Sequence, residues 1–235
     1  MRQLFAEINE TELIMCANNC DKITCSQVRK IRPTRRSVSG SYAFRGKTSI
    51  QYESTLERDF LIRHEFFLDV AEIIPQPVEI PFVASNGRQF TYTPDFLVSF
   101  RSSSPPMLVE VKPTNEWQQN WRIWSSKWKA ARRYAKQRGW IFRISDEARI
   151  RDKTLENIKF LERYKRSSCD QHQSKSLLMT LQEKGPLCLK ELLSIHNLTS
   201  EHVALIRHLI AVRLVDCDIS KPLDDFILLW IPNHE

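Results

Sequence analysis

Two stretches of sequence decide the fold: TYTPDFLVSF, residues 91–100, and MLVEVKP, residues 107–113. Both are rich in β-branched and aromatic residues, and a Ser/Pro-rich turn separates them, so they predict neighbouring strands of one sheet. In the second strand, a period of two places Leu108, Glu110 and Lys112 on one face and the two intervening valines on the other. An acid and a lysine on a strand of core residues require a charged partner, since neither is buried unpaired.

The first strand offers that partner. Pro94 sets Asp95 at the entry to the strand, so pairing of the two strands lets Asp95 and Glu110 share one hard divalent cation. Mg²⁺ takes oxygen ligands and keeps several waters, so two carboxylates and the Val111 carbonyl form a sufficient site, which Mn²⁺ can also occupy. A water beside Lys112 is then the candidate nucleophile for phosphodiester hydrolysis, with Lys112 orienting it or stabilising charge that develops at phosphorus.

A helix is predicted upstream, over residues 55–73, with Ser54 as its N-cap. Two interpretations of Glu57 remain open at this point. Ser54 and Glu57 fit a capping box, in which Glu57 only bonds back to the backbone. Glu57 also lies beside the apolar stripe of the helix, so it could instead point into the site as a further metal ligand.

The remaining elements divide the chain into three parts. Residues 1–49 show little periodicity and end in an extended basic arm broken by prolines and glycines. Residues 50–166 form the candidate catalytic domain, and residues 167–235 follow a polar linker at 165–176. Within the central part, the sequence predicts an antiparallel meander from PVEIPFV to MLVEVK, then helices and a strand at 121–137, 140–144 and 152–164.

The last part predicts a small winged-helix domain. Three short helical segments precede two strand-like runs, LVDCDI and FILLWI. The helical segments are 177–183, 187–196 and 200–212. The third offers only Arg207, with Arg213 directly after it, whereas a DNA reader needs a basic face, so we expect this domain to dock onto a protein.

The charge distribution supports a polyanionic partner. The 235 residues carry a net charge of +7, but residues 51–115 hold 5 cations and 9 anions, and residues 116–166 hold 15 cations and 6 anions. Residues 1–50 are also basic, with 9 cations against 4 anions, and residues 167–235 are acidic, with 6 against 9. An acidic centre between basic segments suits a protein that holds cations at a reaction site and phosphates around it.

The helix over 121–137 has two contrasting faces. Trp117, Trp121, Trp124 and Trp128 recur at helical spacing together with Ala131 and Ala135, which indicates packing on a sheet rather than base stacking. We expect the basic side chains of the other face, with two arginines of the arm, to contact DNA phosphates. These candidate DNA-binding residues are Arg35, Arg36, Lys127, Arg132, Arg133 and Lys136.

Several classes of protein are excluded. No stretch approaches the roughly 20 apolar residues of a membrane helix, and the N-terminus has acids where a signal peptide needs an apolar run. We therefore expect a soluble intracellular protein with reduced thiols. Cys16, Cys20 and Cys25 lack a CxxC pair, so we expect no zinc site there. Without a Walker A loop, any nucleotide hydrolysis must come from a partner.

The PD…ExK spacing resembles the PD-(D/E)xK restriction-endonuclease-like nucleases. More specifically, YESTLERDFL, QPVEIPF, TYTPDFLV, LVEVKP, FRISDEARI and LENIKFLERY resemble the TnsA endonuclease subunit of heteromeric TnsA/TnsB transposons, over about residues 28–165. By this resemblance, Glu57, Asp95, Glu110 and Lys112 match the catalytic acids and lysine of the family. No further catalytic acid is assigned after Lys112.

The resemblance implies a Mg²⁺-dependent endonuclease that cuts the 5′ ends of a transposon while a TnsB-type DDE transposase cuts and joins the 3′ ends. It also implies a C-terminal domain that engages a TnsC-type AAA+ ATPase, and a DNA-associated location in the bacterial cytoplasm. The expected fold class is α/β, a restriction-endonuclease-like mixed sheet flanked by helices with a C-terminal winged-helix domain. The alternatives are a stand-alone restriction or junction-resolving nuclease and a non-catalytic DNA-binding adaptor.

Overall fold

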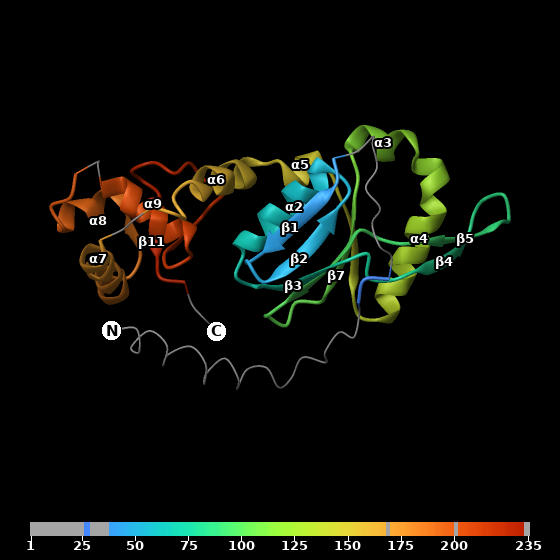
Figure 1. The fold of residues 1–235 in the computed structure, drawn as a ribbon, viewed down its shortest axis with the longest axis horizontal. Coiled ribbons are helices and arrows are strands. Elements are labelled where there is room, and N and C mark those ends of the chain that lie inside the picture. Colours follow the sequence, from blue (N-terminus) through green and yellow to red (C-terminus); the bar gives the residue numbers. More distant parts are fainter. Residues whose placement is uncertain (1–25, 29–37, 168–169, 200–201, 233–235) are drawn as a thin grey trace.

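The protein is described by a computed structural model that covers residues 26–28, 38–167, 170–199 and 202–232. Figure 1 shows a central sheet between helices, with the C-terminal elements gathered at one end and the hairpin β4–β5 projecting at the other. The arrangement is a mixed α/β fold, as the sequence predicts.

The central sheet has the order β3-β6-β7-β8. Its strands are β3 (Val70–Pro75), β6 (Phe96–Phe100), β7 (Met107–Val111) and β8 (Ile141–Ser145). The β3–β6 and β6–β7 pairs are antiparallel, whereas β7 and β8 are parallel. The predicted pairing of the two motif-bearing strands is therefore confirmed, and the sheet is mixed.

Among the described residues up to 167, two hairpins lie outside this sheet. The first joins β1 (Gly40–Phe44) to β2 (Thr48–Tyr52) through Arg45 and Gly46, both in the left-handed region with φ of 49° and 66°. The prediction of an extended arm up to residue 49 is thus wrong for residues 40–49. Phe44 and Ile50 are buried beside the helix that follows, so hydrophobic packing orders this segment.

The second hairpin pairs β4 (Ile80–Val83) with β5 (Gln89–Tyr92). The sequence predicted that these strands belong to one continuous meander, but the hairpin forms a separate two-stranded sheet. The stretch from 88 to 100 breaks at Thr93 and Pro94, because proline has no N–H to donate to a central ladder. Strand β4 packs against the long helix α4, which spans Trp121–Gln137.

Helix α2 (Thr55–Phe66) is shorter than predicted. The chain turns extended at Phe67, with ψ of 119°, and β3 begins at Val70, so residues 67–73 are not helical. The helical spacing of their apolar residues was misleading, since Val70 and Ile73 are buried in the sheet instead. Pairing with β6 determines the structure of this segment.

Helices cover both faces of the sheet. On one face, α2 packs with α5 (Glu147–Ile150) and α6 (Lys153–Glu162) over Val109 and Val111. On the other face, α4 (Trp121–Gln137), preceded by α3 (Thr114–Gln119), packs over Leu108. The alternation predicted for β7 is confirmed, and it directs Glu110 to the α4 side.

The aromatic stripe of α4 forms core contacts, as predicted. Trp128, Ala131 and Ala135 are buried against the sheet, Trp124 packs beside them, and Trp117 joins them from α3. Trp121 departs from the prediction, because it is 51% exposed at the first turn and contacts only the edge of the cluster through Trp128.

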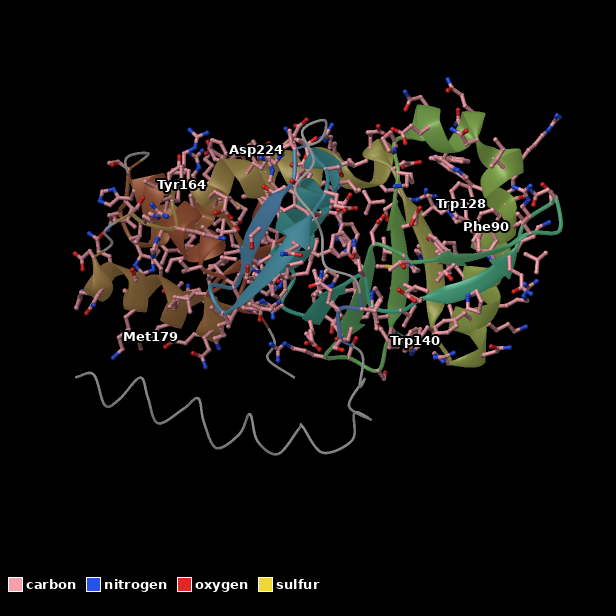
Figure 2. The ribbon with its side chains drawn as sticks, turned by 45° about the vertical axis from the view of Figure 1, so that its right-hand side comes forward. Phe90, Trp128, Trp140, Tyr164, Met179 and Asp224 are labelled. Carbon is pink, nitrogen blue, oxygen red and sulfur yellow. The ribbon has the colours of Figure 1, made fainter. Side chains whose placement is uncertain are left out.

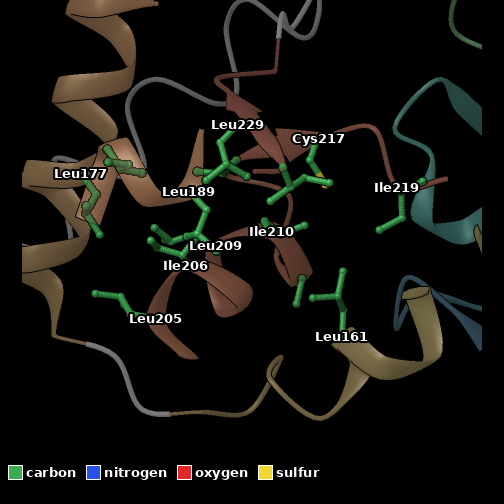
Figure 3. Close-up of a cluster of buried hydrophobic side chains, with 14 of the residues drawn as sticks. Leu161, Leu177, Leu189, Leu205, Ile206, Leu209, Ile210, Cys217, Ile219 and Leu229 are labelled. Carbon is green, nitrogen blue, oxygen red and sulfur yellow. The ribbon is translucent and has the colours of Figure 1, made fainter. Parts of the chain in front are cut away.

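In its described residues, the C-terminal part contains three helices and a three-stranded sheet with the order β10-β11-β9. Its elements are α7 (Gln171–Lys184), β9 (Leu187–Cys188), α8 (Leu189–Ile195), α9 (Val203–Ala211), β10 (Asp216–Cys217) and β11 (Leu228–Trp230). The linker predicted at 165–176 is too long, because α7 already begins at Gln171. The Asp170 carboxylate caps this helix by accepting hydrogen bonds from two backbone N–H groups of its first turn. Figure 3 shows the buried leucine and isoleucine side chains that form the core.

Helix α6 joins the two parts. Ile158 and Leu161 belong to the C-terminal core, and the Asn157 amide donates hydrogen bonds of 2.8 Å to the carbonyls of Ile219 and Lys221. A physical boundary at 166/167 would therefore cut through a shared core. No helix within the described ranges is long and apolar enough to cross a membrane.

Candidate active site

The strand register brings Asp95 and Glu110 together. Phe96 lies opposite Val109, so continuing the register by one residue places Asp95 opposite Glu110. The Val111 N–H donates a 2.7 Å hydrogen bond to Oδ2 of Asp95, which ties the carboxylate to β7. The backbone of Asp95 is also held, because its carbonyl accepts from the N–H of Gln76 at 2.8 Å.

The Glu110 carboxylate is only 2% exposed, and donors occupy both of its oxygens. The Tyr92 hydroxyl donates to Oε2 at 2.6 Å, and the Lys127 ammonium donates to Oε1 at 3.1 Å. Lys112 lies 4.0 Å from the same Oε1. Sequence analysis did not identify Tyr92 as a site residue; its position three residues before Asp95, at the end of a hairpin strand, was the available signal.

Lys112 lies directly after β7, and its N–H donates to the Ser145 carbonyl of β8 at 3.1 Å. Its side chain is 27% exposed. Burial lowers the pKa of this amine, but the carboxylates of Asp95, Glu110, Glu57 and Glu116 outweigh burial and raise it above its ordinary value. In this structure Lys112 is therefore a cation among acids.

Glu57 combines features of both interpretations. The Glu57 N–H donates to Oγ of Ser54 at 3.1 Å, and its carboxylate accepts from the Ser54 hydroxyl at 2.9 Å and the Glu53 N–H at 2.8 Å. It thus stabilises the start of α2. It is also only 7% exposed, and it influences the titration of both Asp95 and Lys112. Burial raises its own pKa.

Asp95 shows how crowded the negative charges are. Burial and the nearby Glu110 carboxylate raise the pKa of Asp95 well above its ordinary value, against the opposing effect of Lys112. A divalent cation would relieve this repulsion, and the carboxylate oxygens of Asp95 and Glu110 are of the ligand type that Mg²⁺ takes. Within the described residues, no three His, Cys, Asp or Glu side chains lie close enough to hold a metal together, so Glu57 is not gathered with the other two acids.

Asp95, Glu110 and Lys112 line one pocket of about 370 Å³ between the sheet, α4 and the β4–β5 hairpin, whereas Glu57 is not part of its lining. Its walls combine the acids and lysines with aromatic rings from the hairpin. Figure 2 labels Phe90 on this hairpin and Trp128 on α4. The lining residues are Glu53, Phe82, Phe90, Thr91, Tyr92, Thr93, Asp95, Glu110, Lys112 and Lys127.

The predicted DNA-binding residues fall into three groups. Arg132, Arg133 and Lys136 are exposed on the outer face of α4. Lys127 departs from that expectation: its side chain is only 17% exposed and points into the pocket. Arg35 and Arg36 lie outside the described residues, as do the three cysteines near the N-terminus.

Comparison with protein families identifies the chain. Residues 68–147 match the family model described as TnsA-like endonuclease N terminal, and residues 149–219 match the model described as TnsA endonuclease C terminal. The chain belongs to the TnsA endonuclease family. This membership makes the chain a TnsA-type nuclease and implies work on DNA within a transposition complex. None of the curated proteins compared with the chain matches it.

The TnsA-like N-terminal match contains Asp95, Glu110, Lys112 and Lys127, whereas Glu57 precedes it. The boundary between the two matches falls just before α6. This agrees with the packing of that helix into the C-terminal core of this TnsA-type nuclease.

Proposed function

We propose that this TnsA-family chain is a Mg²⁺-dependent endonuclease that cleaves the 5′ ends of a transposon, in a complex with a TnsB-type transposase. The observation that carries the proposal is the pairing of Asp95 with Glu110 across two strands, with Lys112 beside them in one pocket. We assign this site to the PD-(D/E)xK, restriction-endonuclease-like class, whose motif spacing it follows.

In this proposal Asp95 and Glu110 hold the cation, with the Val111 carbonyl and Glu57 as further candidate ligands. When bound, the divalent cation supplies positive charge next to the scissile phosphate. Lys112, held at the end of β7 by its hydrogen bond to Ser145, orients the attacking water or stabilises the charge that develops on the phosphate. The Tyr92 hydroxyl and the Lys127 ammonium fix the Glu110 carboxylate.

DNA is proposed to lie along α4. Arg132, Arg133 and Lys136 project from the exposed face of this helix, whose buried face packs over the catalytic strand. Cations that follow the backbone contribute affinity without sequence preference. Recognition of the transposon end is thereby left to the transposase.

The C-terminal part is proposed to be a winged-helix domain that docks a TnsC-type AAA+ ATPase. The element order α7, β9, α8, α9, β10, β11 and the sheet order β10-β11-β9 support this assignment. Apolar side chains such as Phe226, which is 76% exposed, and Leu228 suit a protein partner better than DNA.

The test is strand-resolved cleavage of a transposon-end duplex by the chain assembled with its transposase, over a titration of Mg²⁺ or Mn²⁺. We expect cleavage of the 5′ strand only with the divalent cation, and its loss in a Lys112→Met protein that still shows a cooperative thermal unfolding transition above the assay temperature. Lys153→Met, which removes an exposed lysine of α6, is the matched control and keeps full activity.

Three results would reject the proposal. Cleavage by Lys112→Met at the wild-type rate rejects the assigned site. Efficient cleavage by the chain alone favours a stand-alone nuclease, and the absence of both divalent-cation binding and cleavage favours a non-catalytic DNA-binding adaptor.

A further inference from the structure

Among the described residues that line the pocket, Lys112 directly follows strand β7, whereas Lys127 comes from helix α4. It lies on α4, and the alternation of β7 turns Glu110 toward that helix. Its ammonium group is 3.1 Å from Oε1 of Glu110, and its side chain is 17% exposed. Because Lys127 is largely buried and forms an ion pair with a carboxylate that is 2% exposed, its ammonium group is held in one position.

Aromatic rings fix this position. The Lys127 ammonium lies 4.7 Å from the ring centroid of Tyr92 and 4.9 Å from that of Trp124, with Trp128 at 5.7 Å. Each ring face attracts a cation. Tyr92 also donates its hydroxyl to the other oxygen of Glu110, so one aromatic residue contacts both the acid and the lysine that pairs with it.

These contacts place Lys127 in competition with a metal ion. Oε2 of Glu110 already accepts from Tyr92, and Oε1 faces both Lys127 and, at 4.0 Å, Lys112. A divalent cation that binds Glu110 meets the positive charge of Lys127 at the same oxygen. Lys127 lines the pocket together with Lys112, so a phosphate that entered it would meet two cations.

We propose that Lys127 is a positioning residue that couples metal binding to DNA binding. In the free protein its ammonium group pairs with Glu110, and when the duplex enters the pocket the ammonium group moves to contact a DNA phosphate. Glu110 then binds the divalent cation more tightly when a substrate is present. The inference rests on the proposed function, because it takes Asp95 and Glu110 as the metal site.

The test measures Mn²⁺ binding to the full chain by calorimetry and by tryptophan emission, without DNA and with a saturating short duplex. In the absence of DNA, we expect Lys127→Met to bind Mn²⁺ about tenfold more tightly than the wild type, since one opposing charge is removed at similar side-chain volume. Lys129→Met is the matched control on the same helix; its exposed charge is screened by water, so its Mn²⁺ affinity stays at the wild-type value.

The duplex provides the second readout. It should tighten Mn²⁺ binding to the wild type, and this gain should shrink in Lys127→Met, an effect that a purely structural lysine would not produce. Lys127→Arg keeps the charge and should retain the weak affinity of the DNA-free wild type. Should Lys127→Met fail to fold, Lys127→Gln provides the same measurement with a polar end for Glu110.

Unchanged or weaker Mn²⁺ binding by a folded Lys127→Met protein overturns the inference, as does an equal gain from DNA in the wild type and the variant. Asp95→Asn separates this failure from failure of the proposed function. If Asp95→Asn abolishes Mn²⁺ binding while Lys127→Met leaves it unchanged, only the role of Lys127 is wrong. If Asp95→Asn binds Mn²⁺ like the wild type, the metal site itself is wrong.

Discussion

Asp59 provides the sharpest prediction about stability. It lies on α2, its side chain is 4% exposed, and it accepts hydrogen bonds from Arg151 at 2.7 Å and Lys159 at 2.6 Å. These contacts connect the helix that carries Glu57 to the segment of α5 and α6. Asp59→Asn keeps the shape of the side chain but removes the charge that both cations approach.

The expected loss follows from these contacts. A hydrogen bond to a charged group contributes about 1.5–3 kcal/mol. The Arg151 and Lys159 side chains are 44% and 43% exposed, so water screens both ion pairs. Water also solvates the two cations when the Asp59 carboxylate is lost, so neither becomes a buried unpaired charge. We therefore expect Asp59→Asn to lower the free energy of unfolding by about 2–3 kcal/mol at neutral pH.

The pKa shift of Asp59 determines how its contribution to stability depends on pH. Burial alone would raise the pKa of Asp59, but the hydrogen bonds from Lys159 and Arg151 outweigh it and lower the pKa below the ordinary 3.8. The stabilisation is therefore complete above pH 3.8 and is lost as the pH falls through the lower, folded-state pKa. The difference between wild type and variant should shrink in that acidic range.

Urea unfolding of both proteins at several pH values measures this difference. Glu156→Gln is the control, because it breaks the Lys153–Glu156 pair, whose side chains are 53% and 68% exposed, and should cost below about 0.5 kcal/mol. An Asp59→Asn protein within about 0.5 kcal/mol of the wild type at neutral pH would refute the reasoning.

Three further predictions concern other contacts. Tyr92→Phe removes the donor to Oε2 of Glu110 and should reduce strand cleavage about tenfold, at a cost of about 1–2 kcal/mol in unfolding free energy; cleavage at the wild-type rate would contradict this. Burial lowers the pKa of His64 from 6.5 to about 4, so the free energy of unfolding should fall by about 3 kcal/mol as the pH is lowered from 6.5 to 4, because only the unfolded chain takes up the proton there; in a plot of this free energy from urea unfolding against pH, His64→Gln should flatten that range. Asn157→Ala removes two hydrogen bonds to carbonyls of the C-terminal part and should cost about 2–3 kcal/mol by urea unfolding, and a loss below about 0.5 kcal/mol would show that these bonds do not stabilise the junction.

The placement of the central acids was predictable because it depends on local rules. The period of two in β7 determines which side chains share a face, and the turn between β6 and β7 makes the two strands antiparallel neighbours. These two facts place Asp95 and Glu110 near the same end of the strand pair, and the observed register sets them opposite each other. The helix at Trp121–Gln137 was equally predictable, since its buried stripe repeats at helical spacing.

Other features depend on distant contacts and gave weak local signals. Residues 67–73 have an apolar pattern that fits a helix, yet hydrogen bonds with β6 make Val70–Pro75 a strand. Lys127 lies in the same basic stretch of sequence as lysines and arginines that are exposed. It points into the pocket because its ammonium group pairs with Glu110 on the facing strand. Tyr92 likewise becomes a site residue only because its hairpin folds beside β7. In each case the partner is remote in sequence.

The central claim is that Asp95 belongs to the centre that cuts the 5′ strand. The most direct measurement is strand-resolved cleavage of a transposon-end duplex by the assembled complex, with Asp95→Asn compared with Asp69→Asn, an exposed aspartate that binds Ser102 on the protein surface. We predict that Asp95→Asn loses cleavage of the 5′ strand by several orders of magnitude and keeps transposase cleavage of the 3′ strand, while Asp69→Asn retains both. Cleavage of the 5′ strand by Asp95→Asn at the rate of Asp69→Asn would contradict the account.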